Sequence, residues 1–123
     1  MLKLSTMNKN HITGVIGEYF TCFWFFITQL AIPIKVRNKS KFGEIDLILR
    51  MANTIIFCEV KTRIGVNYTM NEIENLVQRN QINRIKRSAE IFLLSNQKYQ
   101  NFNIAFKISI VKSFIKKPLI FDF

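Results

Sequence analysis

The sequence predicts an α/β protein, a mixed β-sheet flanked by helices with the element order αβββαβ. Three observations carry this prediction. A long apolar segment with helical spacing comes first, three strand patterns follow it closely, and a second helical pattern precedes a late strand. A chain of 123 residues with 49% hydrophobic residues, four glycines and two prolines fits one domain, residues 1–123, with its core at about 13–112.

The first helix is expected at about residues 13–30, with Pro33 ending it. Its second half and the residues after it, YFTCFWFFITQLAIPI at 19–34, are apolar enough to resemble a membrane segment. Thr28 and Gln29 interrupt the run, however, and its unbroken part is shorter than the roughly 20 residues that a bilayer span needs. We therefore expect a largely buried helix that carries the lone carboxylate of Glu18, and no membrane partner.

Three strands are expected at residues 34–38, 42–50 and 54–62, and the tight connection at 51–53 predicts a hairpin between the last two. A long helix is expected at 71–95, followed by a strand at 104–111 and a short one at 119–121. The helix has an apolar stripe formed by Val77, Ile85, Ala89, Phe92 and Leu93.

Composition excludes several kinds of site. Cys22 and Cys58 lie in apolar sequence, which favours buried thiols in a reducing, cytoplasmic compartment over a disulfide framework. His11 is the single histidine, so a Cys/His zinc site lacks ligands and a Ser-His-Asp system is disfavoured. The net charge of +10 would attract a polyanion, either nucleic acid or an anionic membrane surface.

The residues that point to chemistry lie in GEIDLI (43–48) and FCEVKTR (57–63). Strand alternation places Glu44 and Asp46 on one face of the first segment and Glu59 and Lys61 on one face of the second, with Ile45 among the core residues on the opposite side. A turn centred between residues 52 and 53 makes pairing partners sum to 105. Asp46 then lies opposite Glu59, and Glu44 opposite Lys61, with Cβ atoms about 4.5–5.5 Å apart.

Two carboxylates at that distance repel each other, and a divalent metal would remove the repulsion. Mg²⁺ prefers oxygen ligands and commonly uses one or two carboxylates, as Asp46 and Glu59 would offer, while Lys61 could orient water or stabilise developing negative charge. This set suits phosphodiester hydrolysis. The alternative is an ordinary solvated hairpin face, with Glu44 and Lys61 as a surface ion pair.

An Asp followed on the next strand by Glu-x-Lys resembles the active-site motif of the PD-(D/E)XK nuclease superfamily, which has the restriction-endonuclease-like fold. With Gly14-x-x-Gly17-Glu18, GEIDLI and FCEVKTR in order, the chain more closely resembles the YraN-type family of small bacterial proteins, which are similar to archaeal Holliday-junction resolvases. The resemblance covers residues 14–94.

The resemblance implies roles for five residues. Asp46 and Glu59 would bind Mg²⁺ or Mn²⁺ together with the backbone carbonyl of Val60, and Lys61 would be the catalytic lysine. Glu18 would be the helix-borne carboxylate that some branches add to the metal site. Without the resemblance, Glu18 reads as an exposed glutamate in the N-terminal turn of its helix, favoured by the helix dipole.

Two features of the family are not clearly matched by this sequence. Family members carry a glutamine in a basic stretch of the second helix, for which Gln78 and Gln81 are both candidates. The late strand often has an aspartate near the position of Lys107, so substrate handling could differ.

Basic residues are expected to surround the site and contact nucleic-acid phosphates without reading sequence. They are Lys35, Arg37, Lys39, Lys41 and Arg63. The leading hypothesis is a metal-dependent endonuclease acting on structured or branched DNA. The resemblance to resolvases also implies that the protein forms a homodimer. The alternatives are a non-catalytic nucleic-acid-binding adaptor that retains the fold, and a membrane-surface protein anchored by the Phe-rich segment.

Overall fold

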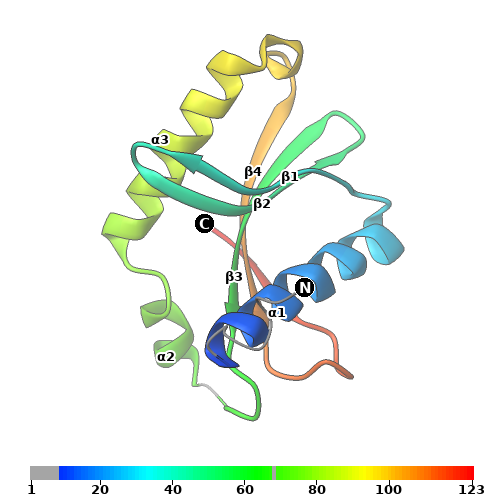
Figure 1. Cartoon of the computed structure of the whole chain (residues 1–123), viewed down its shortest axis with the longest axis vertical. Coiled ribbons are helices and arrows are strands. Elements are labelled where there is room, and N and C mark those ends of the chain that lie inside the picture. Colours follow the sequence, from blue (N-terminus) through cyan, green and yellow to red (C-terminus); the bar gives the residue numbers. More distant parts are fainter. Residues whose placement is uncertain (1–8, 68) are drawn as a thin grey trace.

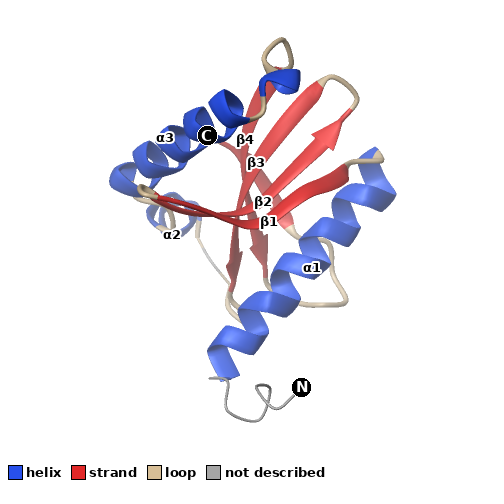
Figure 2. Ribbon diagram, turned by 45° about the horizontal axis from the view of Figure 1, so that its top comes forward, coloured by secondary structure: helices blue, strands red, loops and turns tan. Residues whose placement is uncertain are grey.

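The structure is a computed structural model that describes residues 9–67 and 69–123, and it forms a five-stranded sheet with a long helix on each face (Figures 1 and 2). The elements are α1 (Lys9–Gln29), β1 (Ile32–Ser40), β2 (Gly43–Met51), β3 (Thr54–Thr62), α2 (Met70–Asn75), α3 (Arg79–Ser95), a 3₁₀ turn η1 (Gln97–Tyr99), β4 (Asn103–Val111) and β5 (Leu119–Asp122). The predicted α/β architecture is confirmed, and it is consistent with a restriction-endonuclease-like fold.

The strands lie in the order β1-β2-β3-β4-β5, and β3 is the central strand. β3 pairs with β4 in parallel, whereas the other neighbouring strands are antiparallel. A parallel pair needs a crossover connection, which α2 and α3 supply. The predicted β2–β3 hairpin is confirmed, because its pairs from Met51–Thr54 to Leu47–Cys58 all sum to 105.

Both faces of the sheet are buried, which contradicts the alternative of an ordinary solvated hairpin face. Residues 55–59 of β3 are all buried. Phe57 and Ile48 pack with Ile85 of α3 on one side, while Cys58 and Leu47 pack with Phe25 of α1 on the other. Such continuous burial is expected of a strand covered by helices on both sides.

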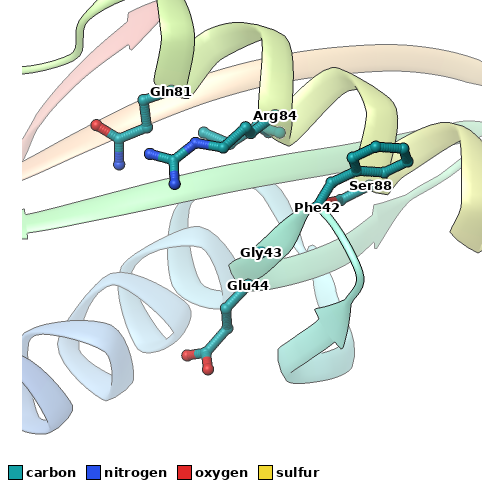
Figure 3. A pocket seen from close by; sticks show the side chains of 7 residues that line it. Phe42, Gly43, Glu44, Gln81, Arg84 and Ser88 are labelled. Atoms are coloured by element: carbon teal, nitrogen blue, oxygen red, sulfur yellow. The ribbon is translucent and has the colours of Figure 1, made fainter.

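Alternation along β2 changes phase at Asp46, and this corrects the predicted faces. Ile45 packs in the cluster on the α3 side, whereas Leu47 packs on the α1 side. Opposite this point Arg37 of β1 has a left-handed backbone (φ 54°), and the ladder contains Val36–Leu47 and Asn38–Ile45 but no Arg37–Asp46 pair. Glu44 consequently extends away from α3 (Figure 3).

The prediction of a largely buried first helix is wrong. α1 buries a single stripe, Gly17, Thr21 and Phe25, against the sheet, because only one side of the helix meets another layer. Within the described residues, no helix combines the length and the apolar character needed to cross a membrane. Cys58 is buried and Cys22 is half-buried, and both are free thiols.

The predicted helix at 71–95 is two helices. Thr69 caps α2 by accepting a hydrogen bond from the backbone N–H of Glu72 (3.3 Å), and its hydroxyl donates to the carboxylate of Glu72 (3.1 Å). Gln78 is extended and begins α3. Burial of the predicted stripe is confirmed for all its members except Leu93, which is half-buried, although Val77 lies in the break between the helices.

α1 approaches β3 closely at Gly17, where any side chain would overlap Thr62 Oγ1. That hydroxyl is buried without a hydrogen-bond partner in the described part of the chain, which indicates how tightly the helix is seated. Gly17 therefore allows the next residue, Glu18, to approach the sheet.

We predict that Gly17→Ala lowers the free energy of unfolding by about 1–3 kcal/mol, because the new methyl group overlaps Thr62. Gly14→Ala is the matched control. Its Cβ meets nothing within 4 Å, so it should stabilise the helix by up to about 1 kcal/mol. Urea unfolding measures both. In the Gly17→Ala background, Thr62→Ala should restore most of the lost free energy of unfolding. If Gly17→Ala and Gly14→Ala changed the free energy of unfolding equally, the close approach of α1 to Thr62 would be contradicted.

Candidate active site

Asp46 and Glu59 lie where β2 and β3 separate. The backbone ladder between these strands ends at Leu47–Cys58, one residue before the predicted Asp46–Glu59 pair. Beyond it, the Asp46 side chain replaces a backbone partner: its Oδ2 accepts a hydrogen bond from the Val60 N–H (2.8 Å). The charge of Glu59 contributes to raising the pKa of Asp46, so the two carboxyl groups lie close to each other, as the turn-based register predicted, although they do not form a ladder pair.

Glu59 is 7% exposed, and its carboxylate is held from two sides. Gln81 Nε2 donates to Glu59 Oε1 (2.8 Å), and Lys61 Nζ lies 3.4 Å from the same oxygen. Lys61 also donates to Gln81 Oε1 at 3.5 Å. Gln81 thus links the carboxylate of Glu59 to the ammonium group of Lys61.

Gln81 rather than Gln78 is therefore the glutamine of the site. Gln78 is exposed and makes no side-chain cap at the start of α3. A signal for Gln81 was present in the sequence, since it lies four residues before Ile85 and continues the buried stripe of the helix. The expected alternative of a Glu44–Lys61 ion pair is wrong, because Lys61 pairs with Glu59.

Burial dominates the electrostatics of the pair. Together with the neighbouring negative charge of Glu59, which contributes less, burial raises the pKa of Asp46 to about 7. Burial also raises the pKa of Glu59, while the adjacent Lys61 cation opposes that rise. Two buried, adjacent carboxylates of this kind are costly to ionise together, and a divalent cation would favour their charged forms.

The pair fits a hard divalent cation with few protein ligands. Among the described residues, no three His, Cys, Asp or Glu side chains gather into a metal-binding group. Asp46 and Glu59 alone match the one or two carboxylates with which Mg²⁺ is commonly held, water and substrate oxygens completing its shell. The structure therefore fits a two-carboxylate site better than a closed protein cage.

Glu18 faces the same region but is already paired. Its Oε1 accepts a hydrogen bond from Arg37 Nε (2.9 Å). Burial raises the pKa of Glu18, and the charge of Asp46 contributes in the same direction. Glu18 lies within α1 rather than in its first turn, so the reading as an exposed dipole-stabilised glutamate is wrong.

Only some of the predicted basic residues lie near the carboxylates of the candidate site. Arg37 and Lys39 line a hollow of about 390 Å³ with Glu18 and Glu44. Arg63 lines a neighbouring hollow together with Val60 and Thr62. In the described part of the chain, no contact brings Lys35 or Lys41 to the carboxylates; Lys41 lies over the ring of Phe42 (5.2 Å to the centroid).

A pocket of about 150 Å³ adjoins the site between α3 and the start of β2. Gln81, Arg84 and Ser88 reach it from α3, and Gly43 and Glu44 border it from the strand (Figure 3). Arg84 lies three residues after Gln81 and extends from the same side of the helix (Figure 3). The pocket therefore places the cation of Arg84 beside the Gln81–Glu59 contact.

We predict that Asp46→Asn stabilises the metal-free protein above about pH 7. The raised pKa means that folded wild type retains a proton that the unfolded chain, with an ordinary pKa of 3.8, has already lost. The stability of wild type therefore falls as the pH rises from about 4 to about 7, while the asparagine variant has no proton to lose at this position. Thermal unfolding with chelator should show a Tm advantage of roughly 3–8 °C at high pH that shrinks as the pH falls toward about 4. Glu90→Gln, which alters an exposed carboxylate on α3, should follow wild type. Stability curves of Asp46→Asn and wild type that run parallel with pH would contradict the raised pKa of Asp46.

Comparison with known proteins identifies the family of the chain. Residues 21–112 match the model of "Uncharacterised protein family UPF0102". A UPF0102 protein of Dictyoglomus turgidum is 40% identical over 92 residues, 74% of each chain. UPF0102 proteins of Bartonella tribocorum and Treponema pallidum are 32% and 30% identical, over 81% and 85% of this chain and 73% and 80% of theirs. The expected resemblance to the YraN-type family is thereby confirmed, and the chain belongs to the UPF0102 family.

Proposed function

We propose that this protein is a metal-dependent endonuclease that hydrolyses phosphodiester bonds in structured or branched DNA. The observation that carries the proposal is the pair of adjacent carboxyls of half-buried Asp46 and buried Glu59, with Lys61 beside Glu59. Gln81 hydrogen-bonds to both Glu59 and Lys61. A purely structural surface pair would be solvated, whereas these carboxyls are kept in an environment that raises the pKa of both.

Asp46 and Glu59, with the backbone carbonyl of Val60, would hold Mg²⁺ or Mn²⁺, which polarises phosphoryl oxygens and makes water a stronger nucleophile. The protein fixes the positions of the carboxylate oxygens that would bind the ion. The Val60 N–H fixes the Asp46 carboxylate, and Gln81 fixes that of Glu59. Both are thereby oriented before any substrate arrives, which reduces the reorganisation needed for catalysis.

Lys61 supplies the fixed positive charge of the site. Its side chain is 17% exposed, so its ammonium group lies in a partly dehydrated position where it can stabilise negative charge developing on a phosphoryl oxygen. Gln81 is a positioning residue, because it acts on the reacting groups through Glu59 and Lys61. Glu18 would join the site only after releasing Arg37, whose guanidinium would then be available to a phosphate.

Cations on two sides of the carboxylates suit a DNA backbone. Arg37 and Lys39 lie on the α1 side, and Arg84 lies on the α3 side. Contacts of this kind supply affinity without sequence readout, which is consistent with recognition of DNA shape.

The second candidate is a nucleic-acid-binding adaptor that retains the nuclease fold. One observation favours it: Glu18, the third carboxylate implied by the resemblance, is neutralised by Arg37. The adaptor would use the same basic surface and would not need Asp46 or Glu59 for binding.

The catalytic test is cleavage of labelled duplex, single-stranded, flap and four-way-junction DNA in Mg²⁺ or Mn²⁺. Asp46→Asn and Lys61→Ala should each lower the rate by at least about 100-fold, because each removes a group that stabilises the transition state. Glu90→Gln, an exposed carboxylate on the outer part of α3, should keep the wild-type rate. Binding without metal-dependent cleavage of any substrate would support the adaptor instead.

The binding test uses Arg84→Ala and Lys39→Ala on the best-bound DNA. Each variant should weaken binding and reduce the slope of log K against log salt by about 1, as expected for one lost phosphate contact. Lys98→Ala is the matched control, since this lysine lies over Tyr99 at the far end of α3 and should leave the slope unchanged. Unchanged slopes in all three variants would place the DNA elsewhere on the protein.

A further inference from the structure

The outer face of α1 carries large apolar side chains in a regular series. Alternating steps of three and four residues separate Ile16, Tyr19, Phe23 and Phe26 of α1, and then Leu30, which directly follows the end of the helix. They are 46%, 64%, 61%, 50% and 75% exposed, respectively. This 3-4-3-4 spacing is that of the seam by which one helix packs along another.

The seam points away from the protein's own core. α1 attaches to the sheet through Gly17, Thr21 and Phe25, which lie on the opposite side of the helix. A helix that is apolar on both sides is normally buried on both sides. In residues 9–67 and 69–123, nothing covers the outer face of α1.

The apolar surface extends beyond the helix. Ile32 at the start of β1 is 59% exposed, and the ring of Phe114 packs edge-on against Phe20 of α1 at 5.8 Å. Residues 19–34 contain no charged residue in a protein of net charge +10. The face therefore offers no charged group to a phosphate backbone or to an acidic partner, and two such faces could meet without burying a charge.

We propose that the outer face of α1 binds the same face of a second copy of this chain. Closed two-fold dimers are the commonest assemblies, and they place one patch against itself. The exposed parts of the seam residues and Ile32 amount to on the order of 800 Å², which is what each partner buries in a stable interface. The dimer does not depend on nuclease activity.

Phe23 is the residue that best tests the proposal. It lies midway between Ile16 and Leu30, so a two-fold axis through the centre of the seam brings Phe23 against its own copy whether the helices run parallel or antiparallel. Two identical charges at this position would repel each other across the axis, whereas opposite charges would attract.

The experiment is sedimentation equilibrium of the full chain. We expect wild type to be dimeric and Phe23→Glu and Phe23→Lys each to be monomeric, while an equimolar mixture of the two variants regains the dimer. Leu94→Glu is the matched control, because Leu94 is equally exposed at 75% but lies on α3, and it should stay dimeric. If Phe23→Glu does not fold, Tyr19→Glu tests the same seam.

Three results would overturn the proposal. A wild-type monomer at about 100 µM would do so, because an interface of this size should associate there. A dimer that survives both Phe23→Glu and Tyr19→Glu would place the interface elsewhere. A wild-type monomer that sediments with phosphatidylglycerol vesicles, and loses that binding in Phe23→Glu, would make this face a membrane-contact surface.

Discussion

The burial of β3 on both faces is the constraint on which the rest of the structure depends. Its residues 55–59 lie between an antiparallel and a parallel neighbour and beneath a helix on each side. Glu59 is the last of these buried residues, so its charge must be matched by hydrogen bonds or by a cation. The Gln81 amide and the Lys61 ammonium group meet this need, and together with Asp46 they form the candidate active site.

The positions of α1 and α3 also depend on β3. Because β3 and β4 are parallel, the chain must cross over, and the break at residues 76–78 allows α3 to start anew and place Gln81 over Glu59. On the opposite face, Gly17 lets α1 approach Thr62 and places Glu18 beside Arg37. The chemistry proposed for the site and the seam proposed for the dimer thus use opposite sides of α1.

Strong local patterns predicted much of this architecture. The tight connection at 51–53 and the alternation that follows it were enough to give the register that brings Asp46 near Glu59. Local patterns did not predict the structure where it depends on contacts with an element distant in the sequence. The change of phase at Asp46 accompanies the left-handed backbone of Arg37 in the neighbouring strand. The helical periodicity at 71–95 continued across a break that leaves Val77 buried outside either helix.

By itself, the sequence determined the order of the long elements, the β2–β3 hairpin and the candidate residues Asp46, Glu59 and Lys61, because strand alternation and turn chemistry act over a few neighbouring residues. Only the tertiary structure decided which glutamine joins the site, that Glu18 is held by Arg37, and that α1 has an exposed apolar seam. Each of these depends on contacts between residues far apart in the chain, and burial is a property of packed layers that a local pattern does not contain.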